Sequence, residues 1–292
     1  MSLPSPASDQ AYCEVSALEA GIIHLPTKAF IHDGKSGEVV VAPSLSFLLR
    51  HSKTGRRLIF DLGLRKDWEN YPPSIVRDIN DFFRVKVQED VCESLSKGGL
   101  TPDDIEVVCL SHLHFDHVSD PRRFGKSTFL VGGPAATLFA PGYPSDPNSE
   151  FASDLLPAGR TQFLDLTHGS PLGPFPRALD YYGDGSLYIT DAAGHLPGHI
   201  NVAVRTSNDG GWLLLAGDSA HHRRLLTGES QIAVSSDGGC AHVDKKAAEE
   251  NLERIKAFMS LPRTRVILAH DEPWYEENKG GPAFWPGTIP ST

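Results

Sequence analysis

Ser111-His112-Leu113-His114-Phe115-Asp116-His117 places three imidazoles and one carboxylate within a single heptapeptide. Such a group is costly to hold together unless something binds it. The alternation puts His112 and His114 on one side of an extended turn, and Asp116 with His117 on the other. One loop can therefore offer two pairs of ligands to two neighbouring metal ions. Imidazole and carboxylate suit borderline divalent ions such as zinc, and the lack of a nearby Cys pair argues against a structural zinc site.

Further segments bring ligand-type residues to the ends of predicted strands. The run IEVVCL at 105–110 is β-branched and apolar, which predicts a buried strand directly before the histidine motif. GHLPGH at 194–199 forms a turn before the strand-like run 201–205, and two apolar runs end in Asp218 and in His270. Four separate segments each deliver a metal-type ligand, so we expect them to meet at one site.

The ordered set HxHxDH, GH after a turn, GD after a strand and a late AH resembles the metallo-β-lactamase superfamily, over about residues 45–271. The resemblance implies an α/β fold, a four-layer αββα sandwich, in which a hydroxide shared by two metal ions attacks the substrate. Asp218 would bridge the two ions. The other implied ligands are His112, His114 and His199 for one ion, and Asp116, His117 and His270 for the other.

The flanking sequence is similar to the N-acyl-homoserine-lactone lactonase branch of that superfamily. Residues 45–51 and 58–63 read as a hairpin ending in FDLG, as the opening of these lactonases does. Two departures put the acyl-homoserine-lactone substrate in doubt. His221 stands where the lactonases carry a tyrosine that polarises the substrate carbonyl, and residues 118–121 lack the usual glycine pair.

Catalytic roles follow from the chemistry of hydrolysis together with this resemblance. Asp116 is expected to carry a proton from the nucleophile to the leaving group, besides acting as a ligand. His221 is a candidate hydrogen-bond donor to the substrate carbonyl, the alternative being a surface histidine. Asp61 is expected to orient a ligand histidine from behind, with Asp271 able to do the same, and His195 to support the site without binding metal. No role is expected for the histidines at 24, 32, 51, 168 and 242.

Composition excludes several classes of protein. The formal net charge is −10 over 292 residues, which argues against a nucleic-acid partner. The four cysteines are scattered and indicate no disulfide framework. With neither a signal-like N-terminus nor a membrane-length apolar run, a cytoplasmic protein without a membrane partner is expected. A homodimer is possible by analogy with lactonases.

The chain reads as a flexible segment, 1–12, followed by a single catalytic domain, 13–292. A helical insertion at about 68–97 either covers the metal cleft or forms a surface helical pair, and Phe82 and Phe83 are its candidate pocket residues. One clear helix is predicted between 237 and 263, with Asp244 as its N-cap.

These features predict a dinuclear zinc hydrolase that opens a small cyclic ester, or a related cyclic amide or carbamate. Two Zn²⁺ ions are the expected cofactors, with iron or manganese as alternatives. A thioester hydrolase of the glyoxalase II type would use the same ligands, but needs a basic patch for its substrate. An iron-dependent persulfide dioxygenase would need one iron and would leave the second set of ligands idle.

Overall fold

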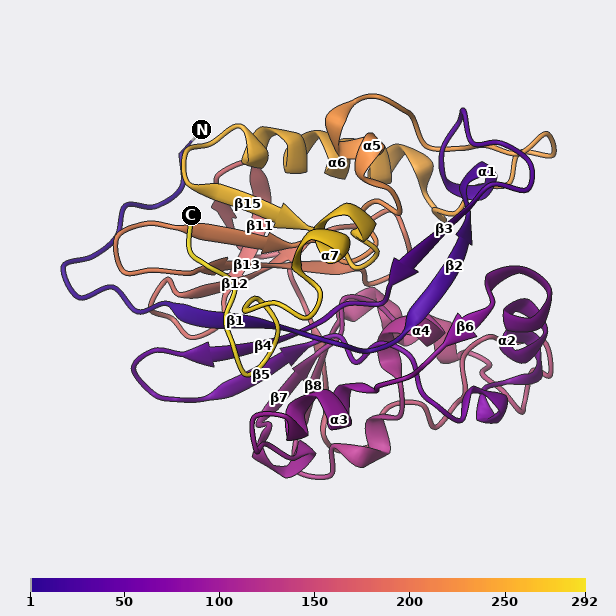
Figure 1. Cartoon of the computed structure of the whole chain (residues 1–292), viewed down its shortest axis with the longest axis horizontal. Coiled ribbons are helices and arrows are strands. Elements are labelled where there is room, and N and C mark those ends of the chain that lie inside the picture. The colour runs from indigo at the N-terminus through magenta and orange to yellow at the C-terminus, as the bar shows by residue number, and fades with distance from the viewer. Residues whose placement is uncertain (1) are drawn as a thin grey trace.

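The computed structural model describes residues 2–292 as two β-sheets packed face to face, with helices on both outer faces (Figure 1). Within these residues the first sheet has the strand order β1-β4-β5-β7-β8-β9, and the second β10-β11-β12-β13-β14-β15. The first sheet consists of β1 (Cys13–Leu18), β4 (Ser46–His51), β5 (Arg57–Phe60), β7 (Val107–Cys109), β8 (Thr128–Gly132) and β9 (Thr161–Leu164). The second consists of β10 (Ser170–Leu172), β11 (Phe175–Asp180), β12 (Leu187–Asp191), β13 (Ile200–Arg205), β14 (Trp212–Leu215) and β15 (Thr264–Ile267).

Alternation along the strands creates three packed layers of side chains. Phe60 of β5 joins a core shared by both sheets, which includes Val202 and Leu215 of the second sheet. The neighbouring Ile59 faces the opposite side and packs with helix α3 (Val91–Ser96), because successive strand side chains point to opposite faces. In the same way Leu214 faces away from the shared core and packs with helix α6 (Lys245–Met259). The predicted αββα sandwich is therefore confirmed.

The outer layers differ in the length of their helices. Helix α6 forms within the predicted range and buries Ala248, Leu252, Ile255 and Phe258 on one face. The side chain of Asp244 accepts a hydrogen bond from Ala247 N at 3.0 Å as its N-cap. The α-helices are α1 (Thr27–Phe30), α2 (Pro73–Asp78), α3 (Val91–Ser96), α4 (Phe115–Val118), α5 (Arg223–Thr227), α6 (Lys245–Met259) and α7 (Glu272–Asn278). Short 3₁₀ turns are η1 (Trp68–Asn70), η3 (Pro102–Asp104), η4 (Pro121–Arg123) and η5 (Gly133–Phe139), and η2 (Ile79–Phe83) is a π-helical turn.

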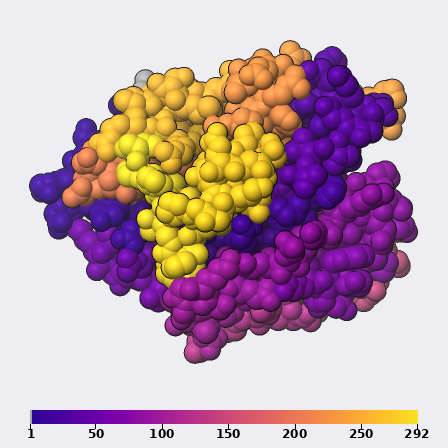
Figure 2. Space-filling model, in the orientation of Figure 1, coloured from indigo at the N-terminus to yellow at the C-terminus, as the bar shows by residue number. Residues whose placement is uncertain are grey.

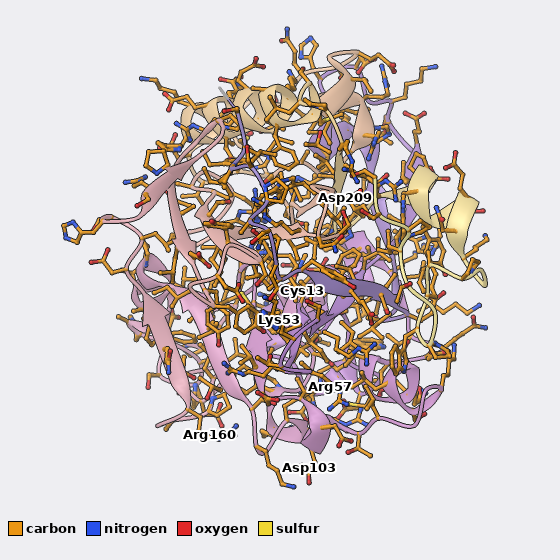
Figure 3. All side chains as sticks on the ribbon, turned by 90° about the vertical axis from the view of Figure 1, so that its left-hand side faces the viewer. Cys13, Lys53, Arg57, Asp103, Arg160 and Asp209 are labelled. Atoms are coloured by element: carbon orange, nitrogen blue, oxygen red, sulfur yellow. The ribbon has the colours of Figure 1, made fainter. Side chains whose placement is uncertain are left out.

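In the side view Cys13 is labelled near the middle of the molecule (Figure 3). Cys13 at the start of β1 is fully buried in the core shared by both sheets, and burial raises the pKa of its thiol to about 12. Asp103, labelled at the lower edge of the same view, is exposed. Within residues 2–292, no helix combines the length and apolar character needed to cross a bilayer.

A small third sheet, with the order β3-β2-β6, projects beyond the sandwich (Figure 1). It consists of β2 (Ile22–Pro26), β3 (Val39–Pro43) and β6 (Val85–Lys86). In the space-filling view this projection and the segment carrying α2 face each other across a notch in the surface (Figure 2). Ile23 of β2 and Ile75 of α2 belong to one apolar cluster. The predicted insertion at 68–97 thus packs against the small sheet.

The N-terminal segment 1–12 was predicted to be flexible, and Met1 lies outside the described residues. Within the described part, the guanidinium of Arg205 donates to Pro4 O at 2.6 Å, and the side chain of Gln10 donates to Asp184 O at 2.9 Å.

Parallel pairing brings the ligand-bearing strand ends together. β5 pairs with β7 in parallel, and β14 pairs with β15 in parallel. Asp61, the histidine motif, Asp218 and His270 each follow the carboxyl end of one of these four strands. Since the carboxyl ends of parallel neighbours lie at one edge of a sheet, all four segments meet at the same end of the sandwich.

Candidate metal centre

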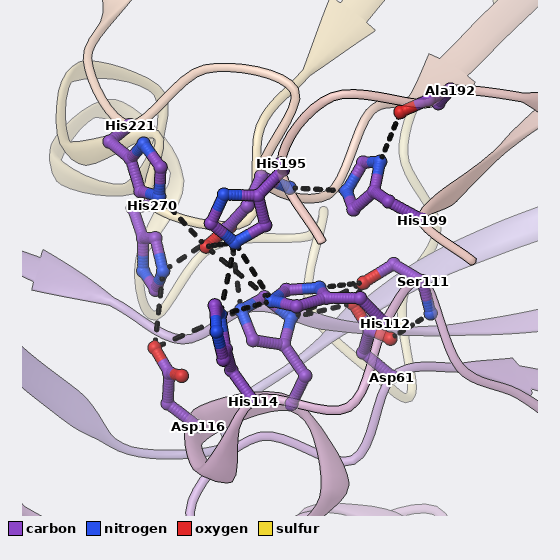
Figure 4. Close-up of polar contacts among 12 residues, drawn as sticks. Asp61, Ser111, His112, His114, Asp116, Ala192, His195, His199, His221 and His270 are labelled. Carbon is purple, nitrogen blue, oxygen red and sulfur yellow. Dashed lines mark hydrogen bonds and ion pairs between the residues drawn. The ribbon is translucent and has the colours of Figure 1, made fainter. Parts of the chain in front are cut away.

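Two groups of ligand-type side chains meet at this end of the sandwich (Figure 4). We call His112, His114 and His195 the first cluster, and Asp116, His117 and His270 the second cluster. Asp218 lies between them.

In the first cluster three imidazole nitrogens converge. His112 Nε2 lies 3.0 Å from His114 Nδ1, and His195 Nε2 lies 3.2 Å and 3.0 Å from these two atoms. Hydrogen bonds alone account poorly for such a triangle, because a neutral imidazole carries one proton shared between two nitrogens. Asp218 Oδ2 completes the group at 3.8 Å from His112 Nε2 and 3.6 Å from His195 Nε2. The donor set fits a cation.

The second cluster has the same character with a carboxylate included. His270 Nε2 lies 3.2 Å from Asp116 Oδ2, and His117 Nε2 lies 3.8 Å from that oxygen. Asp218 Oδ1 is 3.4 Å from both imidazole nitrogens. Three atoms are buried and have no hydrogen-bond partner within residues 2–292: His117 Nε2, His270 Nε2 and Asp218 Oδ1. Buried polar atoms aimed at one point without partners are typical of ligands, so this set also fits a metal ion.

Outer contacts fix the orientation of the ligand rings. Asp61 accepts hydrogen bonds from Ser111 N at 2.6 Å and from Ser111 Oγ at 2.7 Å, and its Oδ2 lies 2.9 Å from His117 Nδ1. Ser111 Oγ also lies 3.0 Å from His112 Nδ1. His270 Nδ1 is 2.8 Å from Pro43 O. Each contact sets which nitrogen points into the centre, and Asp61 has the supporting position that the sequence predicts.

In the first cluster the structure has His195 in the place where the sequence-based ligand set has His199. His199 lies outside both clusters: its Nδ1 is 3.0 Å from Ala192 O, and its Nε2 accepts from Asp218 N at 3.1 Å. Both of its nitrogens are therefore used inside the protein, and His195 takes the position in the first cluster. The GH dipeptide occurs twice, at 194–195 and 198–199, and both fit the motif. Strand β13 begins directly after His199, and this position next to the strand is the signal that could have separated the two histidines.

A glycine is required where β14 meets the histidine motif. Gly217 has φ +47°, and a Cβ there would lie 2.9 Å from both His199 Nε2 and Ser111 Cβ. Only glycine tolerates this backbone conformation and this approach together. The GD pair is thus a packing requirement as well as a ligand motif.

The pKa values of the histidines shift in opposite directions in the two clusters. Burial lowers the pKa of His114 to about 4 and that of His112 well below its usual value. Burial also disfavours the charged form of His270, but Asp218 and Asp116 outweigh it and raise the pKa of His270 to about 10. Burial likewise opposes ionisation of Asp218, but His270 and His117 hold its pKa well below the usual range. The carboxylates are thus ionised, as metal ligands must be.

The remaining candidates fall in different places. His221 Nε2 lies 3.2 Å from Asp218 Oδ2, beside the centre rather than on the surface. His242, for which no role was expected, is buried against His195 and His221. Asp271 does not support a ligand histidine: it forms a 2.6 Å ion pair with Arg223 and caps α7. His222 caps α5 by accepting from Arg224 N at 3.1 Å.

A cavity of about 280 Å³ opens onto both clusters. Its walls are mostly apolar, and Asp78 and Glu150 also line it. No lysine or arginine among the described residues lines it. The apolar lining is Ile23, Leu25, Phe30, Ile75, Phe83, Phe115 and Ala241. Phe83 and Ile75 show that the insertion forms one wall of this cavity, whereas Phe82 is 63% exposed and lies outside it.

Comparison with known proteins identifies the family. The family model described as the metallo-beta-lactamase superfamily matches residues 39–270, and the chain belongs to this superfamily. It is 34% identical over 278 residues to the cytochrome P450 monooxygenase mpaDE' of Penicillium brevicompactum, covering 86% of this chain and 32% of that protein. The chain thus spans about a third of the length of the first curated relatives it matches. It is 36% identical over 208 residues to gamma-lactamase FDB1 of Fusarium pseudograminearum, covering 68% of this chain and 50% of that one.

Solved structures share the fold. An N-acyl homoserine lactone hydrolase, with its product N-hexanoyl-L-homoserine bound at the catalytic metal center, superimposes with a TM-score of 0.71. The two are 17% identical, over 99% of this chain and 100% of that one. AidC, a dizinc quorum-quenching lactonase, gives a TM-score of 0.59 at 16% identity, over 94% of this chain and 91% of that one. The resemblance to the lactonase branch is confirmed at the level of the fold.

Proposed function

We propose that this protein is a dinuclear zinc hydrolase that opens a small cyclic ester, or a related cyclic amide or carbamate. The observation that carries the proposal is the position of Asp218, whose two oxygens face different clusters. Oδ2 lies 3.6 Å from His195 Nε2, and Oδ1 lies 3.4 Å from His270 Nε2. One carboxylate can therefore serve two ions.

The proposed ligands differ from the sequence-based set at one position. The first cluster would hold one ion and the second cluster the other, with Asp218 shared. Imidazole and carboxylate donors suit zinc, and the dizinc lactonase that shares the fold supports this choice. Two such ions, when bound, supply an activated water at neutral pH and polarise the substrate carbonyl.

The protein's own groups then handle the proton and the carbonyl. Asp116 lines the cavity, and its Oδ2 faces His270, so we assign to it the transfer of a proton to the leaving group. His221 also lines the cavity, with Nε2 near Asp218, and is the candidate donor to the substrate carbonyl. Phe30 packs against the His221 ring at 4.5 Å between centroids, which limits its rotation.

The shape and charge of the cavity support a compact neutral substrate. A volume of about 280 Å³ lies just below the usual range for ligand sites, and its aromatic walls suit an apolar ring. The gamma-lactamase relative supports including cyclic amides. A glutathione thioester is a poor match, because Asp78 and Glu150 line the cavity and would repel its carboxylates. The second cluster is complete and supported by Asp61, which favours two ions over a single iron.

A substrate screen with metal analysis tests this proposal. The panel holds γ-lactones, aryl lactones, lactams, cyclic carbamates and a glutathione thioester, and the ring-opened or cleaved product is detected by liquid chromatography and mass spectrometry after the protein is loaded with zinc. Asp116→Asn should abolish turnover of the accepted ring, whereas Asp165→Asn at an exposed loop should leave it unchanged. Equal activity in Asp116→Asn and wild type would refute the proton-transfer role, and hydrolysis of the thioester alone would refute the proposed substrate class.

A further inference from the structure

The second ring nitrogen of His195 is buried without a hydrogen-bond partner among residues 2–292. His112, His117 and His270 each have their second ring nitrogen within 3.0 Å of a protein oxygen: Ser111 Oγ, Asp61 Oδ2 and Pro43 O. His195 is 3% exposed, and its Nδ1 has no hydrogen-bond partner within residues 2–292. With Nε2 directed at the first cluster, a neutral His195 carries its proton on Nδ1. That N–H is a buried donor in need of an acceptor.

Two further imidazoles lie beside the His195 ring. The rings of His221 and His242 lie 4.8 Å and 5.2 Å from that of His195 between centroids, and 5.1 Å from each other. Both are buried, and the Nδ1 atoms of both also lack a partner among the described residues. The three side chains offer ligand atoms within 4.8 Å of one another. Acceptor nitrogens are therefore available beside the His195 donor.

The backbone holds His242 in this position. Val243 N donates to His195 O at 3.0 Å, and Asp244 N donates to Gly194 O at 2.9 Å. Asp244 in turn caps α6, whose Ala248 lies against Gly194. The loop before α6 is thus fastened directly to the turn that carries His195. His221 already contacts Asp218 through Nε2. Of the two neighbouring rings, His242 is therefore the one whose side chain makes no hydrogen bond among the described residues.

We propose that His242 is a positioning residue: after a small rotation of these buried rings its imidazole accepts the Nδ1–H of His195 and thereby holds His195 Nε2 toward the first cluster. The inference rests on the proposed metal centre. It assigns a function to the loop before α6, which contributes no ligand of its own. His242 does not line the catalytic cavity, so it acts through His195 and not on the substrate.

Three substitutions separate a polar role from simple packing. His242→Phe keeps an aromatic ring and removes both nitrogens. His242→Asn and His242→Gln each return a hydrogen-bonding group, near the positions of Nδ1 and Nε2 respectively. The exposed His168→Phe is the matched control. Each protein is loaded with zinc, and the transfer of zinc to a colorimetric chelator is followed, which needs no substrate.

Loss of such a supporting contact costs about 10–100-fold in metal affinity. We expect His242→Phe to bind one of its two ions about 10–100-fold more weakly, with at least one amide variant restored to within a few fold of wild type. Excess zinc should restore kcat in His242→Phe with KM unchanged. Wild-type affinity for both ions in His242→Phe would overturn the inference, as would amide variants as weak as the phenylalanine variant. A wild-type protein that binds fewer than two ions would overturn the proposed function as well, so the two failures are distinguishable.

Discussion

Replacing His195 should weaken metal binding, whereas replacing His199 should lower stability, although both residues stand in a GH pair of the same turn. The nitrogens of the first cluster lie 3.0–3.2 Å apart. Tetrahedral zinc with Zn–N bonds of about 2.0–2.1 Å places its ligands about 3.4 Å apart, so a small expansion accommodates the ion. His195→Ala removes one of four donors from this ion. The loss of affinity should exceed the roughly 100-fold upper value for a supporting contact.

His199→Ala should instead reduce stability and spare the metals. Its Nδ1 lies 3.0 Å from Ala192 O and its Nε2 accepts from Asp218 N at 3.1 Å, so one neutral tautomer satisfies both contacts. Truncation leaves two buried backbone groups without partners, at about 1–3 kcal/mol each. His199 is 1% exposed, so no solvent replaces them without rearrangement.

Metal content after dialysis and chemical unfolding of the zinc-loaded proteins measure both effects. His195→Ala should retain about one ion per chain, and His199→Ala about two with a lower free energy of unfolding. Loss of an ion from His199→Ala, with two ions kept in His195→Ala, would contradict both assignments.

Three further predictions concern the surroundings of the centre. Asp61→Asn removes the charge behind His117 and should weaken metal binding about 10–100-fold, as measured by chelator competition; unchanged affinity would exclude a supporting role. His270, with its pKa raised to about 10 by Asp218 and Asp116, is protonated at pH 7 without metal and must lose that proton to bind. Zinc binding should therefore release protons and weaken as the pH falls. In calorimetry, the heat of binding should then depend on the ionisation enthalpy of the buffer, and a heat that is the same in every buffer would contradict proton release. Asp244→Ala removes the N-cap of α6 and should cost about 0.5–2 kcal/mol in the free energy of unfolding at constant metal content, a loss that Asp244→Asn should largely avoid.

The sequence predicts the sandwich and most of the centre because both depend on local patterns. Apolar runs ending in a ligand define the strands β7, β14 and β15. β14 pairs in parallel with β15, and β7 pairs in parallel with β5, so each sheet brings its ligand-bearing ends to one edge. Six of the seven predicted ligands lie in the two clusters or between them. The helical period after Asp244 likewise depends only on nearby residues, and α6 begins where it indicates.

The exchange of His195 for His199 could not be read from spacing alone. Both follow a glycine, and the choice depends on how the turn meets Asp218 N and Ala192 O across the fold. His242 was also missed, because its contacts with His195 span a sequence separation that no local pattern reports. The position of Asp271 beside His270 indicated a carboxylate that supports a ligand histidine, but its side chain forms an ion pair with Arg223 instead.

Anomalous scattering at the zinc edge, from crystals of the zinc-loaded protein, would locate the bound ions. We expect two peaks about 3.5–4 Å apart, one within the first cluster and one within the second, with Asp218 between them. A single peak would contradict this expectation, as would a peak coordinated by His199 in place of His195.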